Sequence, residues 1–247
     1  MSVRIGTYNL HGLRDSRPEL IKTITALRAD VLCVQEMPKF GRWRARRRAL
    51  ADAAGMRLAT PGRIGGVAVL TGPGVRVLEA RGHALRVFLG LEARGLAVAV
   101  VEAGGTRLAV GSLHLDLSHP ARMYHVAEAM ALMERAAAPY GAAIVLGGDL
   151  NEQPHQPVWR YLTRRLADAC APGPGEGGPT FPAGRPSARI DGLFVTPGTR
   201  VVSCGTAAGV ADPAAASDHL PVLAELRFGR AAGPESGTGG RAGPISP

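Results

Sequence analysis

The middle of the chain constrains the fold most, because short apolar segments follow one another there with almost no room for helices between them. Residues 65–71, 75–80, 85–93, 95–103 and 106–115 each have the length and apolar content of a strand, and short glycine-rich turns separate them. Strands that are joined by such short turns pair as antiparallel hairpins. The spacing therefore predicts a sheet that is mainly antiparallel over this part of the chain.

Strands and helices alternate over the rest of the chain. Strand-like segments also occupy residues 2–9, 30–36, 142–151, 189–196, 199–207 and 220–228. Helical spacing of apolar residues predicts helices at residues 16–29, 42–55, 119–138 and 157–166. Ser16 and Pro18 are suited to the start of the first helix, and Gly55 to the end of the second. This order predicts one α/β domain over residues 1–228, a sandwich in which two sheets pack face to face beneath outer helices.

Bulk properties limit where such a domain works. Its hydrophobic content of 46% can build a sizeable core, and no apolar run approaches the roughly 18 residues of a membrane span. A strand begins at once, which leaves no room for a secretory signal. Cys33, Cys170 and Cys204 lack metal-site spacing, and their odd number fits reduced thiols. We therefore expect a cytoplasmic monomer, with a disordered Gly/Pro-rich tail over residues 229–247.

The net charge of +9 favours an anionic partner such as nucleic acid or an anionic phospholipid. This support is modest, because almost all the basic residues are arginines, and such a preference for arginine also fits the codon usage of a GC-rich genome. The arginine-rich segment 42–50 has two interpretations. Its arginines can contact phosphates while Trp43 stacks on a base, or Trp43, Leu50 and Ala54 face the core of an ordinary surface helix.

Polar side chains recur at the ends of the predicted strands. They are Asn9, Glu36, His114, Asp149, Asn151, Asp191, Asp218 and His219. Each has an ordinary structural explanation, as a turn residue, a solvated strand end or a core histidine. Strand after strand ends in the same chemical groups, however, and that joint occurrence favours a shared functional site.

Convergence of these ends would place several carboxylates in one pocket, where they repel one another unless a cation lies among them. The four acidic residues are Glu36, Asp149, Asp191 and Asp218. Carboxylate and asparagine oxygens are hard ligands, which suit Mg²⁺ or Mn²⁺ far better than Zn²⁺. The two histidines can donate to charge that develops on a phosphoryl group. Metal, acid and histidines together predict phosphoester hydrolysis.

A set of short motifs occurs in one order between residues 3 and 226. They are TYNLHG, VQE, GGVAVLT, SLHL, GGDLNEQP, RIDGLFV and SDHLPV. In this order the chain resembles the endonuclease/exonuclease/phosphatase superfamily, which has the DNase I-like fold. The resemblance implies a four-layer αββα sandwich of two six-stranded sheets, with the site at one edge.

The resemblance also implies metal and water roles. Glu36 would be the principal Mg²⁺ ligand, with Asn9 nearby and Asp218 completing the metal environment. Asp149 would orient and deprotonate the attacking water, and Asn151 would hold that water or a phosphate oxygen. In this interpretation the two glycines before Asp149 let the chain turn sharply and project the carboxylate into the site.

The remaining roles concern the phosphate. His219 would donate to it, oriented by Asp191, and this pairing predicts a raised pKa for His219; a general-base role for His219 remains open. His114 would be a second donor. Arg122 resembles a substrate-contacting arginine, although a solvated helix arginine explains it nearly as well.

Taken together, the sequence predicts a Mg²⁺-dependent phosphodiester hydrolase that acts on nucleic acid. A phospholipid or phosphoinositide is the alternative substrate, and an inactive phosphate-binding scaffold is a remote one. His11 occupies a position where the abasic-site nucleases of this superfamily have Asn or Asp, which argues against abasic-site repair.

Overall fold

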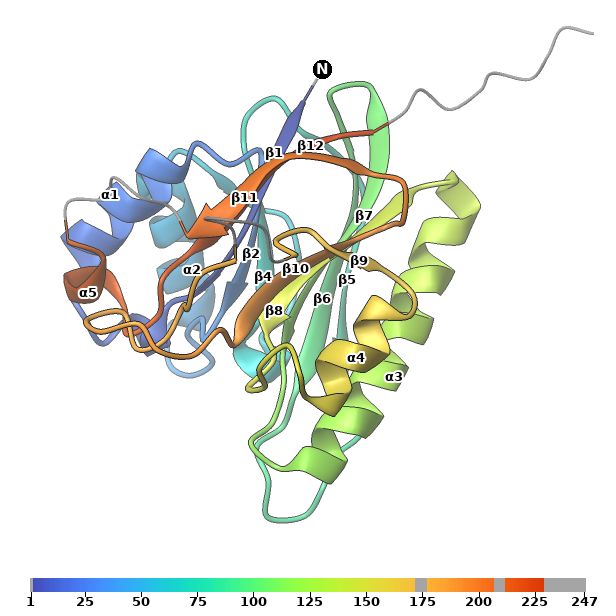
Figure 1. The fold of residues 1–247 in the computed structure, drawn as a ribbon. Helices are drawn as coiled ribbons and strands as arrows, with labels where there is room; N and C mark the ends of the chain where they lie inside the picture. Colours follow the sequence, from blue (N-terminus) through green and yellow to red (C-terminus); the bar gives the residue numbers. More distant parts are fainter. Residues whose placement is uncertain (1, 172–176, 207–211, 229–247) are drawn as a thin grey trace, which may run out of the picture.

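The computed structural model describes residues 2–171, 177–206 and 212–228, and it contains two six-stranded sheets packed face to face (Figure 1). The first sheet has the order β11-β12-β1-β2-β4-β3, with bounds Arg200–Thr206, Val222–Arg227, Val3–Asn9, Val31–Gln35, Ala68–Thr71 and Arg57–Leu58. The second has the order β5-β6-β7-β8-β10-β9, with bounds Arg76–Ala84, Gly95–Ala103, Thr106–His114, Ala143–Asp149, Asp191–Val195 and Ala167–Asp168. The predicted α/β sandwich is confirmed.

Helices form the two outer layers. α1 (Arg17–Leu27), α2 (Trp43–Ala53) and the short α5 (Pro213–Ala216) lie on the side of the first sheet, and α3 (His119–Ala137) and α4 (Pro157–Thr163) cover the second (Figure 1). Single-turn 3₁₀ helices occupy His11–Leu13, Ile64–Gly66 and Ala138–Tyr140. The Ser16 side chain accepts a hydrogen bond from the Glu19 amide, so the predicted cap of the first helix is present.

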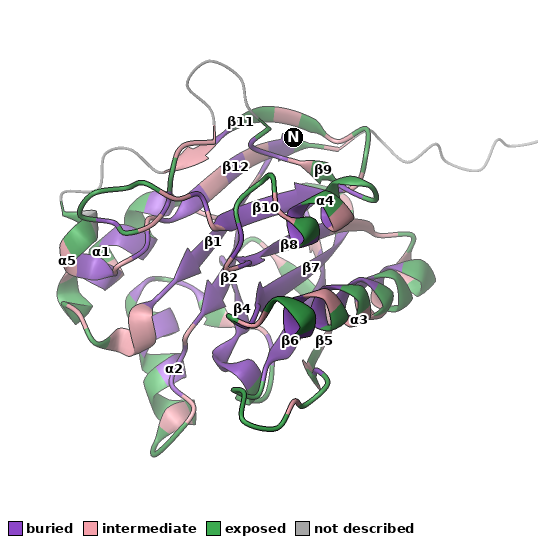
Figure 2. Cartoon of the chain, turned by 60° about the horizontal axis from the view of Figure 1, so that its bottom comes forward, coloured by how far each residue is buried: buried purple, intermediate pink, exposed green. Residues whose placement is uncertain are grey.

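Three apolar clusters hold these layers together. One lies between the sheets and includes Ile5, Val110 and Leu193. The second packs α3 and α4 onto the second sheet around Trp159, and the third packs α1 and α2 onto the first sheet around Leu50. The central strands are buried and drawn purple in Figure 2, whereas the edge strands β5 and β11 are partly exposed.

The strand directions place the polar strand ends together. β1 and β2 run parallel, with Asn9 opposite Gln35, and β7 and β8 run parallel, with His114 opposite Asp149. β10 runs antiparallel to β8 and begins at Asp191, directly opposite Asp149. One end of the sandwich thus collects side chains that are far apart in the sequence.

The strand that was predicted over residues 85–93 is absent. β5 continues to Ala84, which pairs with Gly95 at the start of β6, so residues 85–94 form the connecting loop at the bottom of Figure 1. The apolar pattern of this segment resembles a buried strand, but only Leu85 and Arg94 at its ends are buried, and Leu89 is 100% exposed. The predicted tail at residues 229–247 lies outside the described residues.

The expectation of free thiols is wrong for two of the three cysteines. Cys170 and Cys204 form a disulfide, and Cys33 is free and buried. The disulfide joins the segment after β9 in the second sheet to β11 in the first, so the cysteine pattern gives no support for a reducing compartment. Within the described parts of the chain, every helix is too short or too polar to cross a bilayer.

Replacing Cys204 with Ser will test the contribution of this disulfide. Its ends are 34 residues apart in the sequence, so the chain-entropy relation predicts a loss of about 3–4 kcal/mol in the free energy of unfolding. Urea denaturation followed by circular dichroism measures this loss. Dithiothreitol should destabilise the wild type by a similar amount and leave Cys204→Ser unchanged; equal stability of both proteins in oxidising buffer would contradict the prediction.

Candidate active site

Most of the predicted strand-end residues meet in one buried cluster. Asn9, His114, Asp149, Asp191 and His219 are all buried. Asn9 comes from the first sheet, while His114, Asp149 and Asp191 come from the second. His219 lies just before β12 of the first sheet. The cluster therefore spans the interface between the two sheets at one end of the sandwich.

Asp149 is the centre of this cluster. Its Oδ2 accepts a hydrogen bond from Asn9 Nδ2 at 2.9 Å, and it lies 3.4 Å from His114 Nε2 and 3.7 Å from His219 Nε2. Its Oδ1 accepts from the Asn151 amide at 3.0 Å. The carboxylate is thus held by groups from both sheets, and its orientation is fixed before any substrate arrives.

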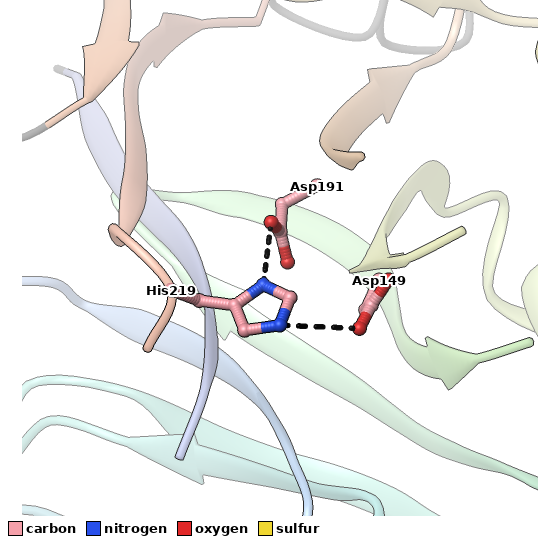
Figure 3. A group of neighbouring side chains, drawn as sticks. All are labelled: Asp149, Asp191 and His219. Carbon is pink, nitrogen blue, oxygen red and sulfur yellow. Dashed lines mark hydrogen bonds and ion pairs between the residues drawn. The ribbon is translucent and has the colours of Figure 1, made fainter. Parts of the chain in front are cut away.

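His219 forms a close pair with Asp191, as predicted. The imidazole Nδ1 lies 2.9 Å from Asp191 Oδ2, while Nε2 points toward Asp149 (Figure 3). Burial lowers the pKa of His219, but the charge and hydrogen bond of Asp191, with help from Asp149 and Asp218, raise it to about 9. His219 is therefore a cation at neutral pH.

His114 and Asp149 have the opposite electrostatic character. Burial lowers the pKa of His114 to about 4, although Asp149 opposes the shift, so His114 is neutral at pH 7 and donates from one ring nitrogen only. Burial raises the pKa of Asp149, which makes its carboxylate a better proton acceptor than an exposed aspartate. The cluster thus combines a basic carboxylate, a cationic histidine and a neutral one.

Several oxygens around the cluster suit a divalent cation. Among the described residues, Asp191 Oδ1 and Asp218 Oδ1 are buried acceptors without a hydrogen-bond partner. One ligand atom from each of Asp149, Asp191 and His219 lies within 4.8 Å of the others. Such unsatisfied carboxylate oxygens fit a hard cation.

Glu36 lies beside this cluster on a constrained backbone. Its Oε1 accepts from Asn9 Nδ2 at 3.2 Å, and its φ of 54° is unusual for a residue with a side chain. The next residues are held by Arg47 of α2, which donates to the carbonyl oxygen of Pro38 at 2.8 Å and to that of Gly62 at 3.0 Å. Arg47 thus anchors the two loops that flank Glu36.

The position of Arg47 corrects both interpretations of the arginine-rich helix. Arg47 is fully buried, so it neither contacts a phosphate in solution nor lies in water with the other arginines. Leu50 and Ala54 face the core as the surface-helix interpretation predicted, and Trp43 is half-buried. Sequence periodicity missed Arg47 because a buried guanidinium bound only to carbonyl oxygens looks like any other arginine of the run.

The glycines before Asp149 also act differently from the prediction. Gly147 and Gly148 lie inside β8, and neither has a positive φ. A Cβ on Gly147 would lie 3.1 Å from Thr7 Cβ and 3.2 Å from Cys33 Cβ of the other sheet, and one on Gly148 would clash with the Leu113 carbonyl oxygen. Gly147 is required because the facing sheet lies close to it, and Gly148 because the backbone of β7 does. The chain turns later, at Asn151, which has a φ of 49°.

Arg122 lies outside the buried cluster. Its Nε donates to Glu152 Oε1 at 2.8 Å, and its NH1 donates to the carbonyl oxygens of Asp116 and Leu117. The guanidinium fixes the loops that follow His114 and Asn151. The solvated alternative is wrong, because Arg122 is buried, and its contact with substrate stays a prediction.

Asp218 and two neighbours complete the rim of the site. Asp218 is partly exposed, and its Oδ2 lies 3.6 Å from His11 Nε2, whose Nδ1 lies 2.7 Å from Asp15. Ser217 accepts a hydrogen bond from the His219 amide and donates to the carbonyl oxygen of Asn9. Sequence reasoning assigned no role to His11 or Ser217, although each stands within a quoted motif, TYNLHG or SDHLPV.

The sandwich and this cluster define a metal-dependent phosphoester hydrolase. The chain belongs to the endonuclease/exonuclease/phosphatase family, whose family model matches residues 6–219. No curated protein matches the chain in sequence.

Solved structures share the whole fold. A mannosyl-6-phosphatase of Bacteroides thetaiotaomicron is 18% identical, with a TM-score of 0.75 over 92% of this chain and 100% of that one. An endonuclease/exonuclease/phosphatase from Beutenbergia cavernae is 24% identical, with a TM-score of 0.69 over 92% of this chain and 72% of that one. The human Nocturnin catalytic domain is 15% identical, with a TM-score of 0.69 over 92% of this chain and 95% of that one. At these identities the likeness shows the fold alone.

Replacing Asp191 with Asn will test the electrostatics of His219. Without the charge and hydrogen bond of Asp191, less opposes the effect of burial, so the His219 pKa should fall from about 9. In the wild type, the stability that His219 contributes is full below pH 6.5 and is lost as the pH rises through about 9. NMR titration of the imidazole protons in metal-free protein measures both values; a titration that Asp191→Asn leaves unchanged would contradict the assignment.

Replacing Gly148 with Ala will test the close packing of β8. The new methyl group would meet the Leu113 backbone, so we expect a loss of about 1–3 kcal/mol in the free energy of unfolding. Gly205→Ala in β11 is the matched control, because nothing lies within 4 Å of its added Cβ. Urea unfolding of both variants gives the comparison. Equal stability of the two would show that β8 shifts without cost.

Proposed function

We propose that this protein hydrolyses phosphodiesters with a divalent metal ion at the buried cluster. The observation that carries the proposal is the arrangement around Asp149. A buried carboxylate with a raised pKa lies within 3.7 Å of the cationic His219, and Asp191 fixes that histidine from its other side. This arrangement supplies a proton acceptor and a proton or hydrogen-bond donor on facing groups.

Each side chain takes a distinct role in this proposal. Asp149 accepts a proton from the attacking water, and Asn151, whose Nδ2 lies 3.4 Å from His114 Nε2, holds that water or a phosphate oxygen. His219 donates to the phosphate oxygen on which charge builds. His114, neutral and buried, is the second donor. The raised pKa of His219 supports this donor role over the general-base role that the sequence left open.

The metal environment follows from the carboxylate oxygens. Glu36 would hold Mg²⁺, or Mn²⁺ in its place, with Asn9 and Asp218 beside it. When bound, the ion would neutralise phosphate charge and assist departure of the leaving oxygen. The close approach of Asn9 to both Glu36 and Asp149, at 3.2 Å and 2.9 Å, ties the position of this ion to that of the base.

Nucleic acid is the substrate that we propose. The net charge of +9 supports it, as do the exposed arginines at the start of α2, Arg42 and Arg44. Arg44 stacks on Trp43 at 4.9 Å, which leaves an aromatic and cationic surface at the start of α2. A phospholipid headgroup is the second candidate, and a specific observation favours it: large apolar side chains are exposed around the same end of the sandwich.

Asp149→Asn will test the base. Losing the proton acceptor should lower nicking of supercoiled plasmid in Mg²⁺ by about 100-fold or more, while circular dichroism stays unchanged. Asp52→Asn, a change at an exposed aspartate of α2, is the matched control and should keep full activity. EDTA should abolish nicking by the wild type.

Two results would change the proposal. Substantial nicking by Asp149→Asn would remove this residue from the role of base. No nicking by wild-type protein that binds Mg²⁺ in calorimetry would contradict DNA as the substrate; release of phosphate or headgroup from RNA or phospholipid would then identify the phosphoester.

A further inference from the structure

Large apolar side chains on the surface gather at one end of the molecule. Of the nine that are exposed among the described residues, seven lie on segments at the end that carries the catalytic cluster. They are Phe40, Ile64, Val87, Leu89, Leu91, Leu117 and Tyr124. The two others, Val77 and Val202, lie on β5 and β11 away from that end. Such clustering departs from the scattered single exposures that are ordinary on soluble proteins.

The loop between β5 and β6 carries the most exposed of these side chains. Val87 is 67% exposed and Leu89 is 100% exposed, and the loop is drawn green near the bottom of Figure 2. Phe88 packs on Tyr124 of α3 with ring centroids 5.7 Å apart. The Arg86 amide donates to Glu128, and Glu92 pairs with Lys39. Both ends of the loop are thus fixed, while its apolar tip is held out in solvent.

Cationic side chains surround this apolar surface. Arg42, Arg44, Arg63 and Arg86 are exposed at the same end. The Arg86 guanidinium lies 5.1 Å from the Tyr124 ring, and Arg63 donates to the Lys39 carbonyl oxygen, so two of the arginines are tied to the segments that carry the apolar groups. The acidic residues nearest to them, Glu92 and Glu128, already have partners, and the partly exposed Asp15 and Asp218 at the rim of the site lie beside His11. The surface therefore combines apolar tips with a positive border.

We propose that this end of the protein docks reversibly on an anionic lipid bilayer. The exposed apolar side chains can be buried only in an apolar phase, and the surrounding arginines require negatively charged groups beside that phase. A bilayer with anionic lipids offers both, because its layer of phosphates lies directly above hydrocarbon. Leu89, Val87 and Leu117 enter the interface, while the arginine border contacts headgroup phosphates.

Docking goes beyond the proposed function and does not need it. The loop that carries Leu89 joins the strand β6, whose Leu96 pairs with Leu113, the residue before His114. Docking would therefore bring the membrane surface to the end of the sandwich where Asp149 lies. Only the further consequence, that phospholipid phosphoesters at that surface reach the buried cluster, rests on the proposed function, and there on its second candidate substrate.

Sedimentation with vesicles tests the proposal. Wild-type protein in EDTA, which stops any metal-dependent turnover, should pellet with vesicles that contain phosphatidylglycerol and far less with phosphatidylcholine alone. Leu89→Asp should weaken binding by about tenfold or more, from the lost burial of one leucine. Val77→Asp introduces the same charge at an exposed valine away from the docking end and should bind as the wild type does. Added salt should weaken binding of all three.

The outcomes separate docking from catalysis. Leu117→Asp gives a second test at an independent loop and should also weaken binding. Wild-type protein that stays in the supernatant with anionic vesicles, or equal binding by Leu89→Asp and Val77→Asp, would overturn the proposal whatever the enzyme hydrolyses. Loss of an oligonucleotide complex in Leu89→Asp, with no vesicle binding by the wild type, would overturn it in favour of a nucleic-acid surface.

Discussion

The rest of the site depends on the close approach of the two sheets, which the hydrogen bond from Asn9 to Asp149 requires. This bond crosses from one sheet to the other, so it exists only if the two sheets approach closely at this end. Gly147 permits that approach, because a side chain there would press on Thr7 and Cys33 of the facing sheet. The packing of the sandwich and the geometry of the site are therefore one requirement, met by a strand that has glycines where most strands have side chains.

Burial shifts the pKa values of the cluster and also costs free energy of folding. Carboxylates that are taken out of water carry a desolvation penalty. Asp191 offsets this penalty by pairing with His219, and Asp149 offsets it through its neighbours from both sheets. The buried acceptor on Asp191 stays unsatisfied without a further partner. A divalent ion would relieve this excess of negative oxygen, so metal binding would stabilise the folded state as well as the reaction.

Local patterns were enough to predict most of the strands and the main helices, because alternation and turn chemistry act over a few residues. The errors came from features that depend on distant parts of the chain. The Cys170–Cys204 disulfide joins different sheets, and Arg47 meets carbonyl oxygens from loops that only the fold brings together. The apolar loop at residues 85–94 was mistaken for a strand because the sequence pattern shows only which residues are hydrophobic. Whether such residues are buried depends on the segments that pack against them in the fold.

The residues of the buried cluster and the exposed side chains around it lie on different parts of the chain. His114, Asp149 and Asp191 stand at strand ends whose register is fixed by the sheet, so their geometry varies little with the surroundings. The loops at residues 37–42, 85–94 and 115–118 are held by side-chain contacts instead of strand pairing, and they carry apolar and cationic side chains that face solvent. Structures with this fold include a sugar phosphatase and Nocturnin, so the fold leaves the substrate open. In this chain the loops around the buried cluster present an amphipathic, positively bordered surface.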